Sequence, residues 1–348
     1  MSNVMSAEDM NTTCAAPDIF EVFTSHIMIA NHAFILTIIC SSFFLSYLAI
    51  LKLTRQNVFP ACTKILLISS IINGLIHQGT TAIIRGRVLH HFLFYHNDPC
   101  SILFASSSCM IEGLFYYYTN LFSSLVCVSL FLDRLLSFFA PYNSHQKKAA
   151  FVFILLQFAI PATLLIWVFY DANYTTYVPM CNCPPPGSRE KFYIVTDIRL
   201  WFFYALFVAS LTLFLVRKNR EKKIVHKDYG VDSRYNSFES YQGTKAVLYV
   251  TIVQLVCLAG TSHIPTYFNK FRGSIPASWY HVTLAFATGL TYANFFVPII
   301  IYYQTNMINE SRRSKIQKLQ IQPGQDQYFN NLQQGWDGLF KNFIAKNH

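Results

Sequence analysis

The chain has 348 residues, of which 53% are hydrophobic and 13% are charged, and its formal net charge at pH 7 is +10. Soluble globular domains contain about 25% charged residues, and a soluble domain of this length could not bury so much apolar surface. The composition therefore excludes an ordinary soluble protein and favours one that lies in a lipid bilayer.

The hydrophobic residues are grouped in blocks of about 20, which is the length of a helix that crosses a bilayer. The blocks predict seven membrane spans, at residues 27–51, 65–84, 106–132, 149–170, 192–216, 246–268 and 279–303. We therefore expect an all-α membrane protein, a seven-transmembrane helix bundle over residues 27–303. Residues 1–26 contain no Lys, no Arg and no apolar core, so the first span is expected to act as its own signal anchor.

The basic residues indicate the orientation of the bundle. Lys and Arg gather on the cytoplasmic side of membrane proteins. One side of this chain holds 20 of them and the other holds 6, including Arg85 and Arg87, while Arg199 falls inside the fifth span. The N-terminal tail, residues 1–26, is therefore expected outside and the C-terminal tail, residues 304–348, inside. Topology then explains the positive charge, and no nucleic-acid partner is expected.

Two N-glycosylation sequons lie on the expected outer side, at Asn11 and Asn173. Both match the Asn-x-Ser/Thr pattern of exposed loops in secreted proteins. Asn173 follows the fourth span closely, so glycosylation is expected more readily at Asn11.

Two segments on the expected inner side mix basic and apolar residues. The loop 217–245 is rich in Lys and Arg, which favours anionic lipid and could dock a cytoplasmic partner. Residues 307–319 combine apolar and basic side chains, which predicts a short amphipathic helix on the inner leaflet.

The nine cysteines divide by compartment. Five are expected outside, where disulfides persist: Cys14, Cys100, Cys109, Cys181 and Cys183. A bond from Cys109 to Cys181 or Cys183 would hold the loop after the fourth span across the bundle, and Cys14 and Cys100 could form a second bond. The sequence leaves this connectivity open.

Polar side chains in the outer halves of the spans predict a small-molecule pocket. Burying them in lipid is costly, so each needs an interior partner or a cavity. The candidate ligand-binding residues are His77, Gln78, Glu112, Tyr116, Tyr117, Asn120, His263 and Tyr267. The alternative interpretation is interhelical hydrogen bonding that only holds the bundle together. Asp197 and Arg199 are interpreted as a pair at the membrane interface.

Three prolines fall inside predicted spans, at Pro161, Pro265 and Pro298. A proline inside a helix removes a backbone hydrogen bond and kinks the helix. We expect these positions to act as hinges.

Several short motifs follow one another along the chain: Thr63-Lys64-Ile65-Leu66-Leu67, His77-Gln78, Asp98-Pro99-Cys100, Leu132-Asp133-Arg134-Leu135, Arg234-Tyr235 with Glu239, Gln254 and Pro298. In this order they resemble the nematode serpentine chemoreceptors of class alpha, over nearly the whole chain. Asp133-Arg134, with Pro141 after it and Cys109 before it, is also similar to the rhodopsin-like pattern of G protein-coupled receptors.

The resemblance implies a G protein-coupled chemosensory receptor in the cell membrane of sensory neurons and their cilia. It implies that a heterotrimeric G protein couples at Asp133, Arg134, Pro141, Arg234 and Glu239. Adjacent helical residues project about 100° apart, so Asp133 and Arg134 need not pair with each other.

The function expected is therefore activation of a heterotrimeric G protein by an external small molecule. A ligand-gated channel or transporter of seven helices is the alternative. No catalytic motif or metal-ligand spacing is present in the sequence, so neither an enzyme nor a cofactor or metal is expected. The ligand and the oligomeric state are left open.

Overall fold

The computed structural model describes residues 14–15, 17–56, 58–95, 97–139, 145–225, 231–270, 282–283 and 285–321. Within these ranges the side chains of residues 18, 145–147, 221–225, 231–240, 265–270 and 315–321 are not described. The chain divides into two compact units, Met1–Tyr302 and Tyr303–His348.

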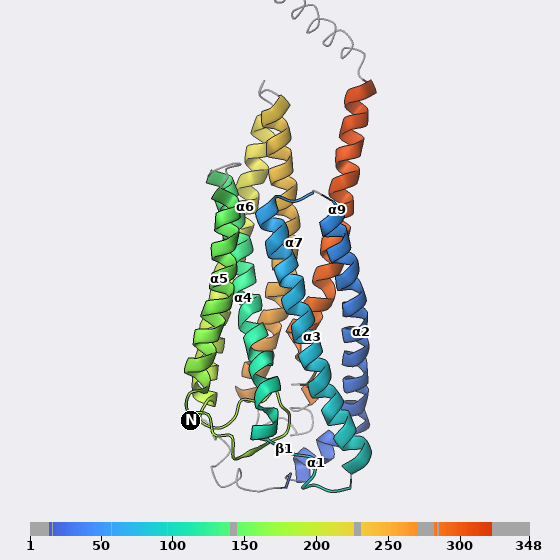
Figure 1. Ribbon diagram of the computed structural model, residues 1–348, viewed down its shortest axis with the longest axis vertical. Helices are drawn as coiled ribbons and strands as arrows, with labels where there is room; N and C mark the ends of the chain where they lie inside the picture. The colour runs from blue at the N-terminus through green and yellow to red at the C-terminus, as the bar shows by residue number, and fades with distance from the viewer. Residues whose placement is uncertain are drawn as a thin grey trace, which may run out of the picture. The chain divides into compact units, whose positions relative to one another are not determined.

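The first unit is built from long helices that run side by side (Figure 1). They are α2 (His26–Arg55), α3 (Ala61–Tyr95), α4 (Met110–Phe139), α5 (His145–Phe169), α6 (Arg189–Val225), α7 (Val231–Lys270) and the first part of α9 (Gly289–Ile321), and the short α1 (Pro17–Phe23) precedes them. Six helices in the described part of the chain are long and apolar enough to cross a membrane. The seventh predicted span, 279–303, begins outside the described residues, and α9 covers its second half.

Helix α4 is central and α5 is peripheral. Helix α4 packs against α3, α5, α6 and α7. Of the residues in its most apolar stretch 50% are buried, whereas the corresponding share for α5 is 17%. Large apolar side chains of α5 such as Phe151 and Phe158 are exposed on the bundle surface. In a membrane this surface meets hydrocarbon, so exposed apolar side chains are expected there.

Polar side chains tie α2, α3 and α9 together. The Ser42 hydroxyl donates to the Asn294 carbonyl over 2.9 Å, and Gln78 Nε2 donates to the Thr291 carbonyl over 3.0 Å. Asn294 lies so close to Gly74 that a Cβ at this glycine would come within 3.0 Å of its side-chain oxygen. Glycine at position 74 therefore allows α3 and α9 to approach closely.

One end of the bundle, which we call the disulfide end, carries a small sheet and both disulfides. Strand β1 (Phe104–Ala105) pairs antiparallel with β2 (Tyr177–Val178), with Phe104 opposite Val178. Helix α1 and β1 lie at this end, at the bottom of Figure 1. Both strands contribute to a buried apolar cluster that also includes Ile84, Val88 and Cys109.

Helix α3 is longer than its predicted span. The hydropathy of the sequence falls after residue 84, where Arg85, Arg87, His90 and His91 follow, yet the helix runs on to Tyr95. Arg85 and Arg87 therefore belong to a membrane-spanning helix and not to a loop, which corrects the sequence interpretation. The helix accommodates both arginines because each finds hydrogen-bond partners on neighbouring elements.

The predicted hinge prolines lie in helices. Pro161 is inside α5 and Pro298 is inside α9. Pro265 falls within the bounds of α7, but its side chain is outside the described ones. The hinge role of all three stays a prediction. The segment 307–319, predicted as an amphipathic helix, is helical as part of α9.

Candidate functional site

Two disulfides close the disulfide end. They join Cys14 to Cys100 and Cys109 to Cys181. The second bond holds the loop between α5 and α6 to the start of α4, as the sequence suggested, and Cys181 rather than Cys183 is the partner. Cys183 is a free, half-buried thiol.

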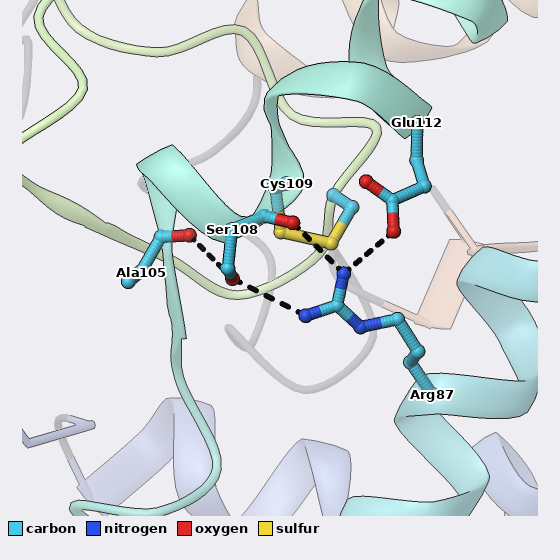
Figure 2. The surroundings of a disulfide bond; sticks show 6 residues. Arg87, Ala105, Ser108, Cys109 and Glu112 are labelled. Atoms are coloured by element: carbon cyan, nitrogen blue, oxygen red, sulfur yellow. Dashed lines mark hydrogen bonds and ion pairs between the residues drawn. A yellow bond between two sulfur atoms is a disulfide. The ribbon is translucent and has the colours of Figure 1, made fainter.

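Beside this disulfide, Arg87 fastens α3 to the start of α4 (Figure 2). Its Nη1 donates to Glu112 Oε1 over 2.7 Å and to the Ser108 carbonyl over 3.0 Å. Its Nη2 donates to the Ser108 hydroxyl over 3.2 Å, and that hydroxyl donates to the Ala105 carbonyl over 2.9 Å. Glu112, a predicted ligand-binding residue, is therefore engaged in an ion pair that supports the disulfide.

A pocket opens next to the disulfide, between the α5–α6 loop and the start of α4. Its lining includes Tyr117, Phe169, Tyr174, Cys181 and Cys183. The Tyr117 hydroxyl donates to the Asn182 carbonyl over 2.5 Å. Of the predicted ligand-binding residues, Tyr117 is the one in this lining.

The fifth cysteine at this end is expected to be unreactive. Burial raises the pKa of the Cys183 thiol, while Arg189, the Met180 backbone and Arg85 lower it by less. Because the thiolate is the nucleophile, we expect maleimide at pH 7.4 to leave Cys183 unmodified in the native protein in detergent and to label it after denaturation. Peptide mapping checks this, with an exposed Thr175→Cys variant as the fast-reacting control. Equal labelling rates for the two cysteines would contradict the expectation.

Three predicted ligand-binding residues lie near one another deeper in the bundle. The His77 ring lies 5.0 Å from the Tyr116 ring. Asn120, one turn along α4 from Tyr116, faces Arg199 of α6, with 3.5 Å between Asn120 Oδ1 and Arg199 Nη1. Gln78 is not part of this group, since it bonds to Ser42 and to the Thr291 carbonyl.

Arg85 is a buried cation that the sequence interpretation had placed in a loop. Its side chain is 1% exposed. Nη1 donates to His32 Nδ1 over 3.0 Å and to Asn31 Oδ1 over 3.3 Å, and Nη2 donates to the Ala285 carbonyl over 2.9 Å. A long apolar stretch followed by an arginine is the usual pattern of a helix end. The hydropathy of the sequence therefore predicted that the span ends before Arg85.

Arg199 is a second cation with neutral partners. Its Nη2 lies 3.4 Å from the Ser262 hydroxyl of α7, and its guanidinium lies over the Phe203 ring, 5.8 Å from the centroid. Asp197 is exposed and belongs to none of the ion pairs among the described residues. The predicted Asp197–Arg199 pair is therefore wrong, because residues two apart on a helix project about 200° apart.

His263 does not belong to the group of His77, Tyr116 and Asn120. His263 is exposed on α7 and contacts the hydroxyl of Tyr204, which is 46% exposed. The Tyr267 side chain lies outside the described ones. Nothing in the spacing of residues along α7 indicated which face His263 occupies.

At the opposite end of the bundle, which we call the Arg134 end, Asp133 and Arg134 pair with each other. Arg134 is 2% exposed. Its Nη2 and Nε donate to Asp133 Oδ2 over 2.6 and 3.0 Å, and the Thr63 hydroxyl donates to the same oxygen over 2.7 Å. The sequence left open whether the two residues pair, and in the structure they do, because the long arginine side chain reaches back to its neighbour.

Helices α6 and α7 also meet Arg134. Arg217 Nη2 donates to the Arg134 carbonyl over 2.6 Å, and a Cβ at Gly243 would come within 3.0 Å of Arg134 Nη1. Of the other predicted coupling residues, Pro141 lies outside the described residues, and the side chains of Arg234 and Glu239 lie outside the described ones.

The sequon residue Asn173 is exposed, and its Oδ1 accepts from the Thr175 hydroxyl over 2.7 Å. Asn11 lies outside the described residues. Glycosylation at both stays a prediction.

Comparison with known proteins gives a consistent result. The family model described as serpentine type 7TM GPCR chemoreceptor Sra matches residues 9–336. The chain is 48% identical over 313 residues to serpentine receptor class alpha-28 of Caenorhabditis elegans, covering 89% of this chain and 92% of that protein. It is 46% identical to serpentine receptor class alpha-29 over 90% of this chain and 92% of the relative, and 44% identical to class alpha-31 over 93% and 96%, both from the same organism.

Proposed function

Since the chain belongs to the Sra family of serpentine seven-transmembrane chemoreceptors of the G protein-coupled receptor type, we propose that it binds an external small molecule and activates a heterotrimeric G protein. It is a multi-pass membrane protein. Its proposed place is the plasma membrane of sensory neurons, in their cilia.

One observation carries the coupling proposal: three helices each contribute one residue to the surroundings of Arg199 and one to the Arg134 end. They are Asn120 and Arg134 on α4, Arg199 and Arg217 on α6, and Ser262 and Gly243 on α7. From Arg199 to Arg217 a helix advances about 27 Å. A ligand that moves these helices near Arg199 therefore also acts on the packing of Arg134.

The Arg134 end supports a two-state mechanism. The Arg134 guanidinium is held by Asp133 and Thr63 and lies against Gly243. We propose that the ligand favours a second arrangement in which α6 and α7 move away and Arg134 becomes accessible to the G protein. A ligand shifts such a balance only by its differential affinity for the two states.

The proposal requires the disulfide end to face outward. The excess of Lys and Arg on the opposite side supports this, as do the two disulfides, which persist in oxidising compartments. We expect an epitope tag before Met1 to stain on intact cells and one after His348 only after permeabilisation. The reverse staining would contradict both the orientation and the receptor function.

The coupling itself is tested in cells that express the receptor together with a panel of G protein α subunits. External small molecules are screened for nucleotide exchange on these subunits, measured in membranes from the cells. Membranes without the receptor serve as the control. A cue-dependent ion current without nucleotide exchange on any α subunit would instead favour a ligand-gated channel.

A further inference from the structure

Two cations in the disulfide-end half of the bundle have no acidic partner among the described residues. The ion pairs among the described residues are Arg87–Glu112, Arg134–Asp133 and Lys191–Asp171, so neither Arg85 nor Arg199 has a carboxylate partner there. Buried charges in proteins are normally paired or coordinate a metal. Arg85, at 1% exposure, departs from this rule.

The sequence explains why most of the helices cannot supply an acid to these cations. Helices α2, α3 and α5 and the whole stretch 240–309 contain no Asp or Glu. Of the acidic side chains described near this end, Glu112 pairs with Arg87. The others are exposed: Glu21, Asp98, Asp171, Glu190 and Asp197. The surroundings of Arg85 and Arg199 therefore carry a local excess of positive charge.

The residues that hold Arg85 leave further donors without partners in the described part of the chain. A guanidinium only donates, so His32 Nδ1 accepts from Arg85 and neutral His32 carries its proton on Nε2. This Nε2 is buried and has no partner among the described residues, and the same holds for Asn31 Nδ2. Buried donors without partners are costly, so an acceptor is expected near them.

Arg199 repeats the pattern on the other helices. Its Nε is buried without a partner in the described part of the chain. Asn120, whose Oδ1 lies 3.5 Å from Arg199 Nη1, is one turn along α4 from Tyr116, and His77 is about two turns along α3 from Arg85. The His77 ring packs against the same tyrosine.

We propose that Arg85 and Arg199 together bind the charged group of an organic anion, a carboxylate-bearing small molecule, next to Tyr116. Guanidinium groups bind carboxylates through paired, charge-assisted hydrogen bonds, and His32 and Asn31 supply further donors. The rings of Tyr116 and His77 offer contact for the apolar part of the molecule. This assignment rests on the proposed receptor function and adds the chemical class of its ligand.

A purely structural role for Arg85 is the main alternative. Its bonds to Asn31, His32 and the Ala285 carbonyl tie α3 to α2 and to the segment before α9. A structural anchor predicts no selective binding of anions. An anion site predicts that binding depends on the charge of both the ligand and the arginines.

The test uses the purified full-length receptor in neutral detergent and measures its thermal unfolding midpoint. The probes are benzoate and hexanoate, each beside its uncharged amide, at equal concentration and ionic strength. We expect the carboxylates to raise the midpoint and the amides not to, because a ligand that binds only the native state stabilises it. Equal effects of acids and amides, or no effect of the acids, would overturn the proposal.

Three variants locate the effect. Arg85→Gln and Arg199→Gln keep hydrogen-bond donors but remove the charge, and each is expected to weaken the apparent affinity for the carboxylates about tenfold or more. Arg87→Gln is the matched control on the same helix, since Arg87 already pairs with Glu112, and its carboxylate affinity should equal that of the wild type. Carboxylate binding that survives both Gln variants would also overturn the assignment.

One further measurement separates the remaining outcomes. If one Gln variant fails to fold, the wild-type comparison of acid and amide still decides. Receptor in nanodiscs with and without phosphatidylglycerol shows whether a lipid headgroup is the anion instead, in which case the lipid and not the carboxylates raises the midpoint. None of these unfolding measurements needs a G protein. A failure of carboxylates to raise the midpoint therefore leaves the coupling proposal intact, and an absence of nucleotide exchange leaves the anion site intact.

Discussion

Replacing Arg134 with alanine is expected to abolish agonist-driven nucleotide exchange, and replacing it with lysine is expected to reduce it strongly. Arg134 is where α3, α4, α6 and α7 converge. Lysine keeps the charge but loses the planar fork that engages Asp133 through two nitrogens. The measurement is nucleotide exchange at matched surface expression, and activity at the wild-type level in both variants would show that Arg134 has no part in coupling.

Matched surface expression is essential because Arg134→Ala leaves Asp133 without its cation. Removing one partner of a buried ion pair costs about 3–5 kcal/mol, so less of this variant is expected to reach the membrane. Asp133→Asn is the informative control, since it loosens the hold on Arg134 and keeps the guanidinium. We expect this variant to raise exchange in the absence of ligand, which a general loss of folding would not do.

Replacing Cys109 with serine is expected to remove most receptor from the cell surface. The Cys109–Cys181 bond spans 72 residues, and chain-entropy arguments assign a loop of this length roughly 4 kcal/mol of stabilisation. The bond also fixes the α5–α6 loop over the pocket that Tyr117 lines. Flow cytometry of an N-terminal tag, with total expression measured in parallel, gives the surface fraction.

Three companion variants make the disulfide experiment specific. Cys181→Ser should match Cys109→Ser, and the double variant should be no worse than either, because all three remove the same bond. Cys183→Ser removes a thiol that is free in the structure and should leave surface expression near the wild-type level. A strong loss with Cys183→Ser and none with Cys181→Ser would assign the bond to Cys183.

Much of the fold was predictable from hydropathy. Six predicted spans correspond to membrane-spanning helices, because a block of apolar residues of the right length has few alternatives in a bilayer. Helix ends were less predictable, and α3 shows why. Arg85 and Arg87 look like the end of a span in the sequence, but the bundle offers them partners and the helix continues.

The candidate site was predictable only in part. His77, Tyr116 and Asn120 lie near one another as expected from polar residues in apolar spans. Glu112 was assigned to the ligand and is engaged by Arg87 instead. Arg85 was placed beyond the end of a span and Arg199 in a pair at the membrane interface, because a sequence shows that a charge lies in or near a span but not whether an acid faces it.

By itself the sequence determined that this chain is a helical membrane protein, where most of its spans lie, and which cysteines can form disulfides. These properties depend on residues that are close together in the chain. The tertiary structure alone decided that Cys109 bonds to Cys181, that Asp133 holds Arg134, and that the partners of Arg85 among the described residues are neutral. The physical reason is that a charge or a thiol is satisfied by its neighbours in space, and the Ala285 carbonyl that meets Arg85 is 200 residues away along the chain.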